Sequence, residues 1–169
     1  MENTPYLFIS SIIIPPRKKG NPFLLTGLSF WAILAVKGCV FMEITVGMKG
    51  EVSSFVERED TAKEVGSGSL LVYATPCMVA LMEGAACEAI EEAMDETKTT
   101  VGTALNIEHI SATPVGMDVR AEAVVTAVDG KVITFEIHAF DEAGEIGKGT
   151  HKRVIVPTQK FLDKAYNKL

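Results

Sequence analysis

Three polar residues of this 169-residue chain have types and positions that suit acid–base chemistry. Glu83 interrupts a run of apolar residues, where a carboxylate costs free energy unless it is paired or used. Thr75 stands before Pro76 at the start of that run, and His109 follows further along the chain. A carboxylate, a hydroxyl and an imidazole could together accept, hold and donate a proton, which is the basis of general acid–base catalysis.

Each of these residues also has a structural explanation. Glu83 could face solvent at the edge of a helix, because acidic residues are rarely buried without a partner. Thr75 followed by Pro76 is typical of a helix start, with Thr as the N-cap and Pro at the first helical position. A single histidine on a strand is more often structural than catalytic. The case for a site therefore depends on the elements that carry the three residues.

The hydrophobic pattern predicts those elements. Apolar residues recur at helical spacing over residues 76–94, which indicates one long helix that carries Glu83. A strand is expected before it, at 52–57, and a short closing helix at the end of the chain, at 161–168. Four extended segments lie between them, at 99–112, 118–128, 131–140 and 147–156. This order predicts an α+β fold in which a curved antiparallel sheet wraps a long central helix, and its free edge strands favour a partner chain.

Composition narrows the class of protein. The formal net charge of -6 disfavours a general nucleic-acid role, because phosphate binding needs a basic surface. Hydrophobic residues make up 47% of the chain, which is enough for a substantial core. Cys39, Cys77 and Cys87 form no C-x-x-C pair, so they indicate neither a disulfide framework nor a zinc site. A reducing cytoplasm is the expected location.

Residues 1–47 differ in composition from the rest, and we place them outside the predicted domain, residues 48–169. A basic cluster at 17–19 precedes a mostly apolar run at 23–42, which is barely long enough to cross a membrane. The cluster resembles the flank of a signal or membrane segment. Alternatively, translation starts at Met42 or Met48, and the upstream residues are not part of the working protein. We therefore expect membrane association only if residues 23–42 are a true anchor.

Four segments carry a more specific pattern, namely residues 73–83 (YATPCMVALME), 102–109 (GTALNIEH), 112–116 (ATPVG) and 149–153 (GTHKR). Together they resemble the fluoroacetyl-CoA thioesterase family of hotdog-fold proteins, and the resemblance runs from about Val52 to Pro157. It implies a dimeric hotdog fold and a catalytic set formed by Thr75, Glu83 and His109. It also implies a substrate-binding role for Arg153, at the acyl end of the pocket, with Gly116 nearby. No cofactor is implied, since coenzyme A is part of the substrate.

The activity that the resemblance implies is hydrolysis of an acyl-CoA thioester. Glu83 suits the role of general base or nucleophile, and His109 could protonate the leaving thiolate or orient Glu83. The N–H groups at the helix N-terminus, where Thr75 lies, suit the thioester oxygen. A hotdog acyl-CoA hydratase and a non-catalytic protein that binds acyl-CoA or another small ligand are the alternatives.

One departure from the family concerns the loop before the helix. The member specific for fluoroacetyl-CoA has phenylalanines there, which form a lid over the acyl group. Residues 65–70 of this chain (VGSGSL) contain no aromatic residue, and the first one is Tyr73. We therefore expect a broader range of short acyl groups.

The spacing of Thr75 and Glu83 raises a geometric question. The straight α-helix between them spans about 12 Å, at about 1.5 Å per residue, so the two side chains cannot touch. Either the helix bends or begins late, or Thr75 meets Glu83 and His109 of the partner subunit. The second arrangement would make a homodimer obligatory for activity. The sequence leaves open whether dimers pair further into tetramers.

Overall fold

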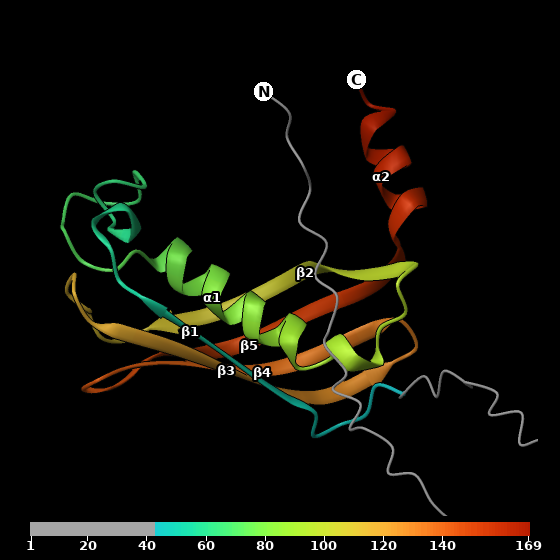
Figure 1. Cartoon of the computed structure of the whole chain (residues 1–169), viewed down its shortest axis with the longest axis horizontal. Coiled ribbons are helices and arrows are strands. Elements are labelled where there is room, and N and C mark those ends of the chain that lie inside the picture. The colour runs from blue at the N-terminus through green and yellow to red at the C-terminus, as the bar shows by residue number, and fades with distance from the viewer. Residues whose placement is uncertain (1–42) are drawn as a thin grey trace, which may run out of the picture. The chain divides into compact units, whose positions relative to one another are not determined.

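The computed structural model describes residues 43–169, in which one long helix lies against the concave side of an antiparallel sheet (Figure 1). The sheet has five strands in the order β1-β3-β4-β5-β2. The elements in chain order are β1 (Lys49–Phe55), the 3₁₀ turn η1 (Arg58–Asp60), α1 (Thr75–Glu88), the 3₁₀ turn η2 (Glu91–Ala93), β2 (Lys98–His109), β3 (Asp118–Asp129), β4 (Val132–Asp141), β5 (Gly144–Pro157) and α2 (Thr158–Tyr166). The predicted α+β fold and the predicted order of elements are confirmed.

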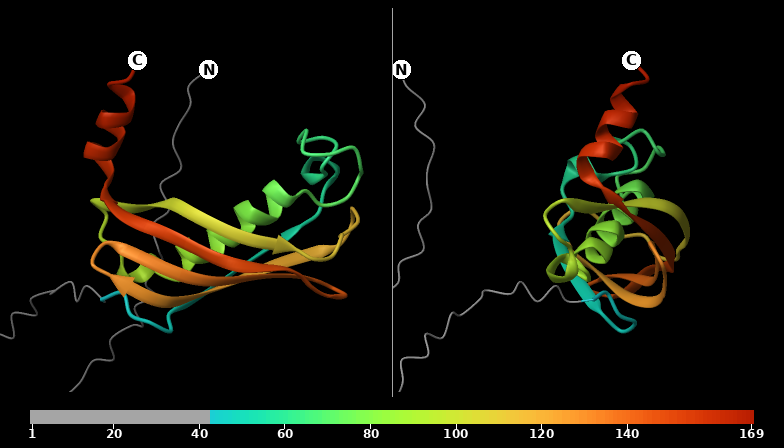
Figure 2. Two further views of the ribbon diagram at one scale, coloured as in Figure 1. Left: turned by 180° about the vertical axis from the view of Figure 1, so that it is seen from behind. Right: turned by 90° about the vertical axis from the view of Figure 1, so that its right-hand side faces the viewer.

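The core lies between α1 and the sheet that curves around it (Figure 2). Side chains of α1 that point to the sheet are fully buried, and they meet the inward side chains of β3 and β4. The buried set includes Met78, Met82, Ala85 and Ala86 from α1, Val119, Ala121, Ala123 and Val125 from β3, and Ile133, Phe135, Ile137 and Ala139 from β4. The small alanines let the sheet approach the middle of the helix closely, and α1 packs mainly against β1 and β3.

The central helix is shorter than the apolar pattern indicated. We predicted a helix over residues 76–94, but α1 ends at Glu88 and η2 follows. Ile90 leaves the helical conformation, with φ -125° and ψ 3°, and is only 1% exposed in the core. Burial of Ile90 therefore takes precedence over continuation of the helix, and Glu91 and Glu92 lie in η2 rather than in the last turns of α1.

Strand β2 forms one edge of the sheet, and within residues 43–169 it pairs only with β5. Its register shifts between Gly102 and Ala104, so Thr103 occupies a β-bulge. A bulge bends a strand and changes the direction of neighbouring side chains. The alternation predicted along residues 99–112 is therefore interrupted beside the middle of α1.

The N-terminal part of the described structure runs along the core before β1 begins. Ile44 and Met48 are partly buried and pack against the hydrophobic core. The apolar run at 23–42 lies outside the described residues. Within the part that is described, no helix is both long enough and apolar enough to span a membrane.

Candidate active site

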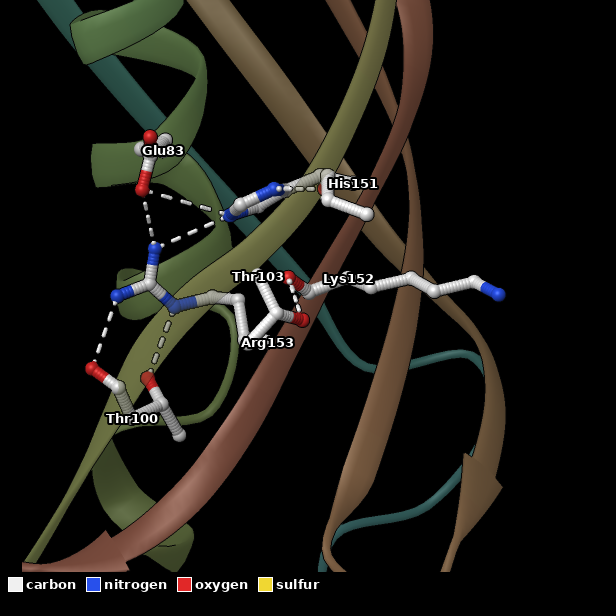
Figure 3. Close-up of polar contacts among 7 residues, drawn as sticks. Glu83, Thr100, Thr103, His151, Lys152 and Arg153 are labelled. Carbon is white, nitrogen blue, oxygen red and sulfur yellow. Dashed lines mark hydrogen bonds and ion pairs between the residues drawn. The ribbon is translucent and has the colours of Figure 1, made fainter.

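Glu83 lies in the middle of α1 and faces the edge of the sheet formed by β2 and β5 (Figure 3). Its Oε2 accepts a hydrogen bond from Arg153 Nη1 at 2.8 Å. The Arg153 side chain is 8% exposed and the Glu83 side chain 38%, so the ion pair is buried on the arginine side and open on the carboxylate side. Among the described residues no group donates to Oε1 of Glu83. One carboxylate oxygen is thus fixed, and the other is free to meet water or a ligand.

Arg153 is held by three groups besides the carboxylate. Its Nε donates to Oγ1 of Thr100 at 2.9 Å, and its Nη2 donates to the Thr100 carbonyl at 3.0 Å. Its Nη1 also lies 3.1 Å from Nε2 of His151. A planar guanidinium with contacts on all of its nitrogens has little freedom to move. The charge opposite Glu83 is therefore rigidly placed.

His151 is the third member of this cluster, and its side chain is 1% exposed. Its Nδ1 lies 3.0 Å from the carbonyl oxygen of Ala104, and its Nε2 lies 3.5 Å from Oε2 of Glu83. Burial lowers the pKa of His151 from its usual value of 6.5, against the opposing effects of the Ala104 carbonyl and of Glu83. The neutral ring is consequently the favoured form, and the sequence pattern alone did not indicate a role for this residue.

Gly102 on β2 lies directly opposite Glu83 and leaves room for it. A Cβ atom at this position would be 2.9 Å from Oε2 of Glu83 and 3.1 Å from Cε1 of His151, so the Glu83 carboxylate would have to shift to make room for it. The adjacent bulge residue Thr103 bonds instead to the carbonyl of Lys152, at 3.2 Å from its Oγ1. Lys152 itself points away from Glu83 (Figure 3). The wall that faces the Glu83 carboxylate is thus formed by residues 100–102 of β2 and by two alternate residues of β5, His151 and Arg153.

Thr75 and His109 form a second polar pair at the N-terminus of α1. Oγ1 of Thr75 lies 2.8 Å from Nδ1 of His109 in the same chain. The N-cap is Ala74, and no side chain caps the helix, so the prediction that Thr75 is the N-cap is wrong. The hydroxyl turns toward β2 instead of toward the first amides of the helix. Nε2 of His109 is buried without a hydrogen-bond partner among the described residues.

The pair borders a shallow pocket of about 300 Å³ at the end of the sheet. The pocket is lined by Val72, Tyr73, Thr75, His109, Ile110, Ser111 and Ala112. Burial raises the pKa of Tyr73 and also that of Cys77 in the first turn of α1, so both remain protonated near neutral pH. Neither residue is therefore suited to act as the nucleophile, which leaves the hydroxyl and the imidazole as the reactive groups here.

The structure thus brings the predicted residues together in two groups rather than one. Thr75 contacts His109, and Glu83 contacts Arg153, whereas α1 is a continuous helix that keeps the groups about 12 Å apart along its axis. The alternative of a late-starting helix is wrong, because α1 begins at Thr75. The expectation that Thr75 meets His109 of the partner subunit is also corrected, because the contact forms within one chain.

Gly116 lies apart from both groups in the described contacts. Its N–H donates to the carbonyl of Val56 at 2.9 Å, and its φ of 97° is a conformation that glycine adopts most easily. A backbone requirement therefore explains Gly116, and its suggested role beside the acyl group stays a prediction. His151 was missed as a member of the site, although its position two residues before Arg153 on a strand places both side chains on one face.

A helix wrapped by a five-stranded antiparallel sheet, with a fixed carboxylate on the helix and a histidine on the edge strand, defines a hotdog-fold protein with acid–base chemistry at that edge. Residues 56–159 match the family model described as fluoroacetyl-CoA-specific thioesterase. The chain belongs to this family. The predicted hotdog fold and thioesterase activity are thereby confirmed.

Individual relatives agree with this assignment. The fluoroacetyl-CoA thioesterase of Streptantibioticus cattleyicolor is 36% identical over 97 residues, which cover 57% of this chain and 70% of that protein. A solved structure of the fluoroacetyl-CoA thioesterase FlK superimposes with a TM-score of 0.71 at 29% identity, and the match covers 76% of this chain and 99% of the other. A thioesterase superfamily member from Thermus thermophilus follows with a TM-score of 0.67 at 28% identity, over 75% and 93% of the two chains.

Proposed function

We propose that this thioesterase hydrolyses short-chain acyl-CoA to the free acid and coenzyme A, with Glu83 as the central catalytic residue and without a cofactor. The observation that carries the proposal is the state of the Glu83 carboxylate. One oxygen is fixed by Arg153 at 2.8 Å, and the other has no donor among the described residues. A carboxylate that is oriented but not fully engaged suits a general base or a nucleophile.

The active site is completed by a second copy of the chain. Thr75 and His109 pair with each other, but Thr75 lies about 12 Å along α1 from Glu83, so the pair cannot reach Glu83 of the same protomer. The free edge of β2 carries Gly102 beside Glu83 at one point and His109 at another. A groove between two such edges would contain both kinds of polar group. We therefore infer a homodimer with two equivalent sites, and we place it in the cytoplasm, since Cys77 and Cys87 are free thiols.

Strand geometry indicates how the two edges meet. Two antiparallel β2 strands related by a two-fold axis pair residues symmetrically about the axis. An axis near Leu105 and Asn106, midway between Gly102 and His109, places Gly102 of one protomer opposite His109 of the partner subunit. Paired strands lie about 4.8 Å apart. This register brings the Thr75–His109 pair of one protomer to the Glu83 carboxylate of the other.

The reaction follows from this arrangement. Glu83 removes a proton from water while the water oxygen adds to the thioester carbon. The electrons of the C=O double bond move onto the carbonyl oxygen. N–H groups in the first turn of the partner subunit's α1, which have no acceptor within the helix, stabilise that oxyanion. Collapse of the intermediate breaks the C–S bond, and the thiolate receives the proton from Glu83, either directly or through His109 of the partner subunit. In the covalent alternative, Oε1 of Glu83 attacks the carbon, and the C–S bond breaks as the coenzyme A thiolate leaves and takes a proton from His109 of the partner subunit or from water. Water then hydrolyses the resulting anhydride to the free acid and the Glu83 carboxylate.

The loop before α1 supports a range of short acyl groups rather than fluoroacetyl alone. Residues 65–70 contain no aromatic residue, and the nearest one, Tyr73, is only 4% exposed. Leu70 and Leu71 are 66% and 44% exposed, and they are flexible aliphatic side chains rather than a flat aromatic cover. A site without an aromatic lid selects less strictly for the size and shape of the acyl group.

A hydrolysis screen tests the proposal. The purified protein is assayed with acyl-CoA substrates of increasing chain length, fluoroacetyl-CoA included, and the released thiol is measured with a chromogenic reagent. We expect kcat/KM to be highest for chains of about two to four carbons, with fluoroacetyl-CoA within roughly tenfold of acetyl-CoA. A strong preference for fluoroacetyl-CoA or for long chains would contradict the proposed substrate class. Release of no thiol from any of them would favour a binding protein.

A further inference from the structure

We propose that His151 is a positioning residue that keeps the Glu83 carboxylate half free, by accepting one of the two Nη1 hydrogens of Arg153. This inference rests on the proposed role of Glu83 and extends it. The contacts that carry it are those of Nη1, which lies 2.8 Å from Oε2 of Glu83 and 3.1 Å from Nε2 of His151. A guanidinium Nη carries two hydrogens, so each can serve one of these acceptors.

The hydrogen bonds of the cluster are complete only if His151 is neutral with its proton on Nδ1. Nδ1 faces the Ala104 carbonyl at 3.0 Å, which can only accept, so Nδ1 must donate. Nε2 then presents a lone pair to Arg153. Among residues 43–169, the charged groups that face the ring are Glu83 from α1 and Arg153 from β5, while β2 offers the Ala104 carbonyl and β4 offers the ring of Phe135. Burial at 1% exposure and an adjacent guanidinium both favour the neutral ring.

The consequence concerns how Arg153 binds Glu83. Arginine and carboxylate groups tend to form two parallel hydrogen bonds when nothing else competes. Here Nε and Nη2 are bound to Thr100, and the second hydrogen of Nη1 is bound to His151. Arg153 therefore reaches only Oε2, and Oε1 remains open to water and to the thioester. Without an acceptor at Nε2, the free hydrogen of Nη1 would turn toward the carboxylate and compete with the substrate.

Two substitutions separate positioning from packing. His151→Phe keeps a buried ring without an acceptor, and His151→Gln places an amide oxygen near the position of Nε2. We expect His151→Phe to lower kcat at least about tenfold with KM changed by less than about threefold, because a positioning group acts mainly on the transition state. We expect His151→Gln to stay within about threefold of wild-type kcat. The control is His138→Gln, a histidine that pairs with Glu145 at 2.6 Å outside the cluster, which should leave kcat unchanged.

Wild-type kcat in His151→Phe, or an equal loss in a folded His151→Gln, would overturn the proposal. If His151→Phe does not fold, nuclear magnetic resonance of the ¹⁵N-labelled wild-type imidazoles decides, with His151 assigned from the spectrum of the Gln variant. We expect a neutral Nδ1–H ring at neutral pH, and a charged ring or an Nε2–H tautomer would refute the account. Full turnover in a Glu83→Gln variant would instead remove the proposed function and leave the tautomer result standing.

Discussion

Subunit complementation tests the two-chain active site. Thr75→Ala removes the 2.8 Å contact between Thr75 and His109 and so disables the polar pair at the N-terminus of α1. Glu83→Gln disables the carboxylate. Mixed and fully exchanged at equal concentration, the two inactive proteins give heterodimers as about half of all dimers. Each heterodimer contains one site with an intact Glu83 and an intact Thr75–His109 pair, and one site that lacks both. About a quarter of all sites are then complete, so we expect about a quarter of wild-type turnover.

The same exchange performed with a Thr75→Ala and a His109→Ala protein is the matched control. Both substitutions affect the same polar pair, so no heterodimer site is complete and activity should not return. The assay is thiol release under saturating acyl-CoA, with subunit exchange verified by native mass spectrometry of isotope-labelled chains. Absence of recovery in the first mixture, despite proven exchange, would mean that Glu83 acts with groups of its own chain, and the dimeric site would be refuted.

Three further predictions concern the wall that faces the Glu83 carboxylate, the pH dependence of stability and the N-terminal segment. Gly102→Ala places a Cβ atom 2.9 Å from Oε2 of Glu83. We expect kcat of this variant to fall about tenfold to hundredfold, with little change in melting temperature. A kcat equal to that of the wild-type protein would contradict this geometry. The pKa of His151 is lowered in the folded state, so the unfolded chain binds more protons than the folded chain below the usual value of 6.5. The free energy of unfolding should therefore fall as pH drops below that value. Urea titrations near pH 7.5 and about pH 5.5 should show a smaller fall for His151→Gln than for the wild-type protein. A chain that starts at Met42 keeps Ile44 in its contact with the core, so we expect it to form a soluble, folded dimer. Its melting temperature, measured by circular dichroism, should lie within a few degrees of that of the full-length chain. Aggregation of the shortened chain would show that residues 1–41 are structural.

The fold could be predicted because each local pattern has one dominant physical cause. Asp129-Gly130 sets the hairpin between β3 and β4, and the apolar alternation along residues 131–140 sets the buried face of β4. The end of α1 could not be predicted in the same way. Ile90 continues the helical apolar pattern in sequence, but in the structure its side chain enters the core from a non-helical backbone. Tertiary packing of this kind leaves no signal in the local sequence.

The site was predictable in its residue types and less so in its contacts. Glu83, Thr75 and His109 were selected through the resemblance to the thioesterase family, because each residue alone also has a structural explanation. The partners of Glu83 could not be derived, because the bulge at Thr103 determines which residues of β2 and β5 face the helix. An alternating His-x-Arg on β5 is the one signal that could have indicated the place of His151 beside the carboxylate.

The turnover of Glu83→Gln, compared with that of Glu88→Gln on the same helix, tests the central claim most directly. Gln at position 83 keeps the shape and can still accept a hydrogen bond from Arg153, but it removes the base, while Glu88 is exposed and lies outside the proposed site. With saturating acetyl-CoA, we expect kcat to fall at least about hundredfold for Glu83→Gln and to stay at the wild-type level for Glu88→Gln. If folded Glu83→Gln protein releases thiol at the wild-type rate, then the carboxylate on α1 does not perform the hydrolysis, and the account of this site is wrong.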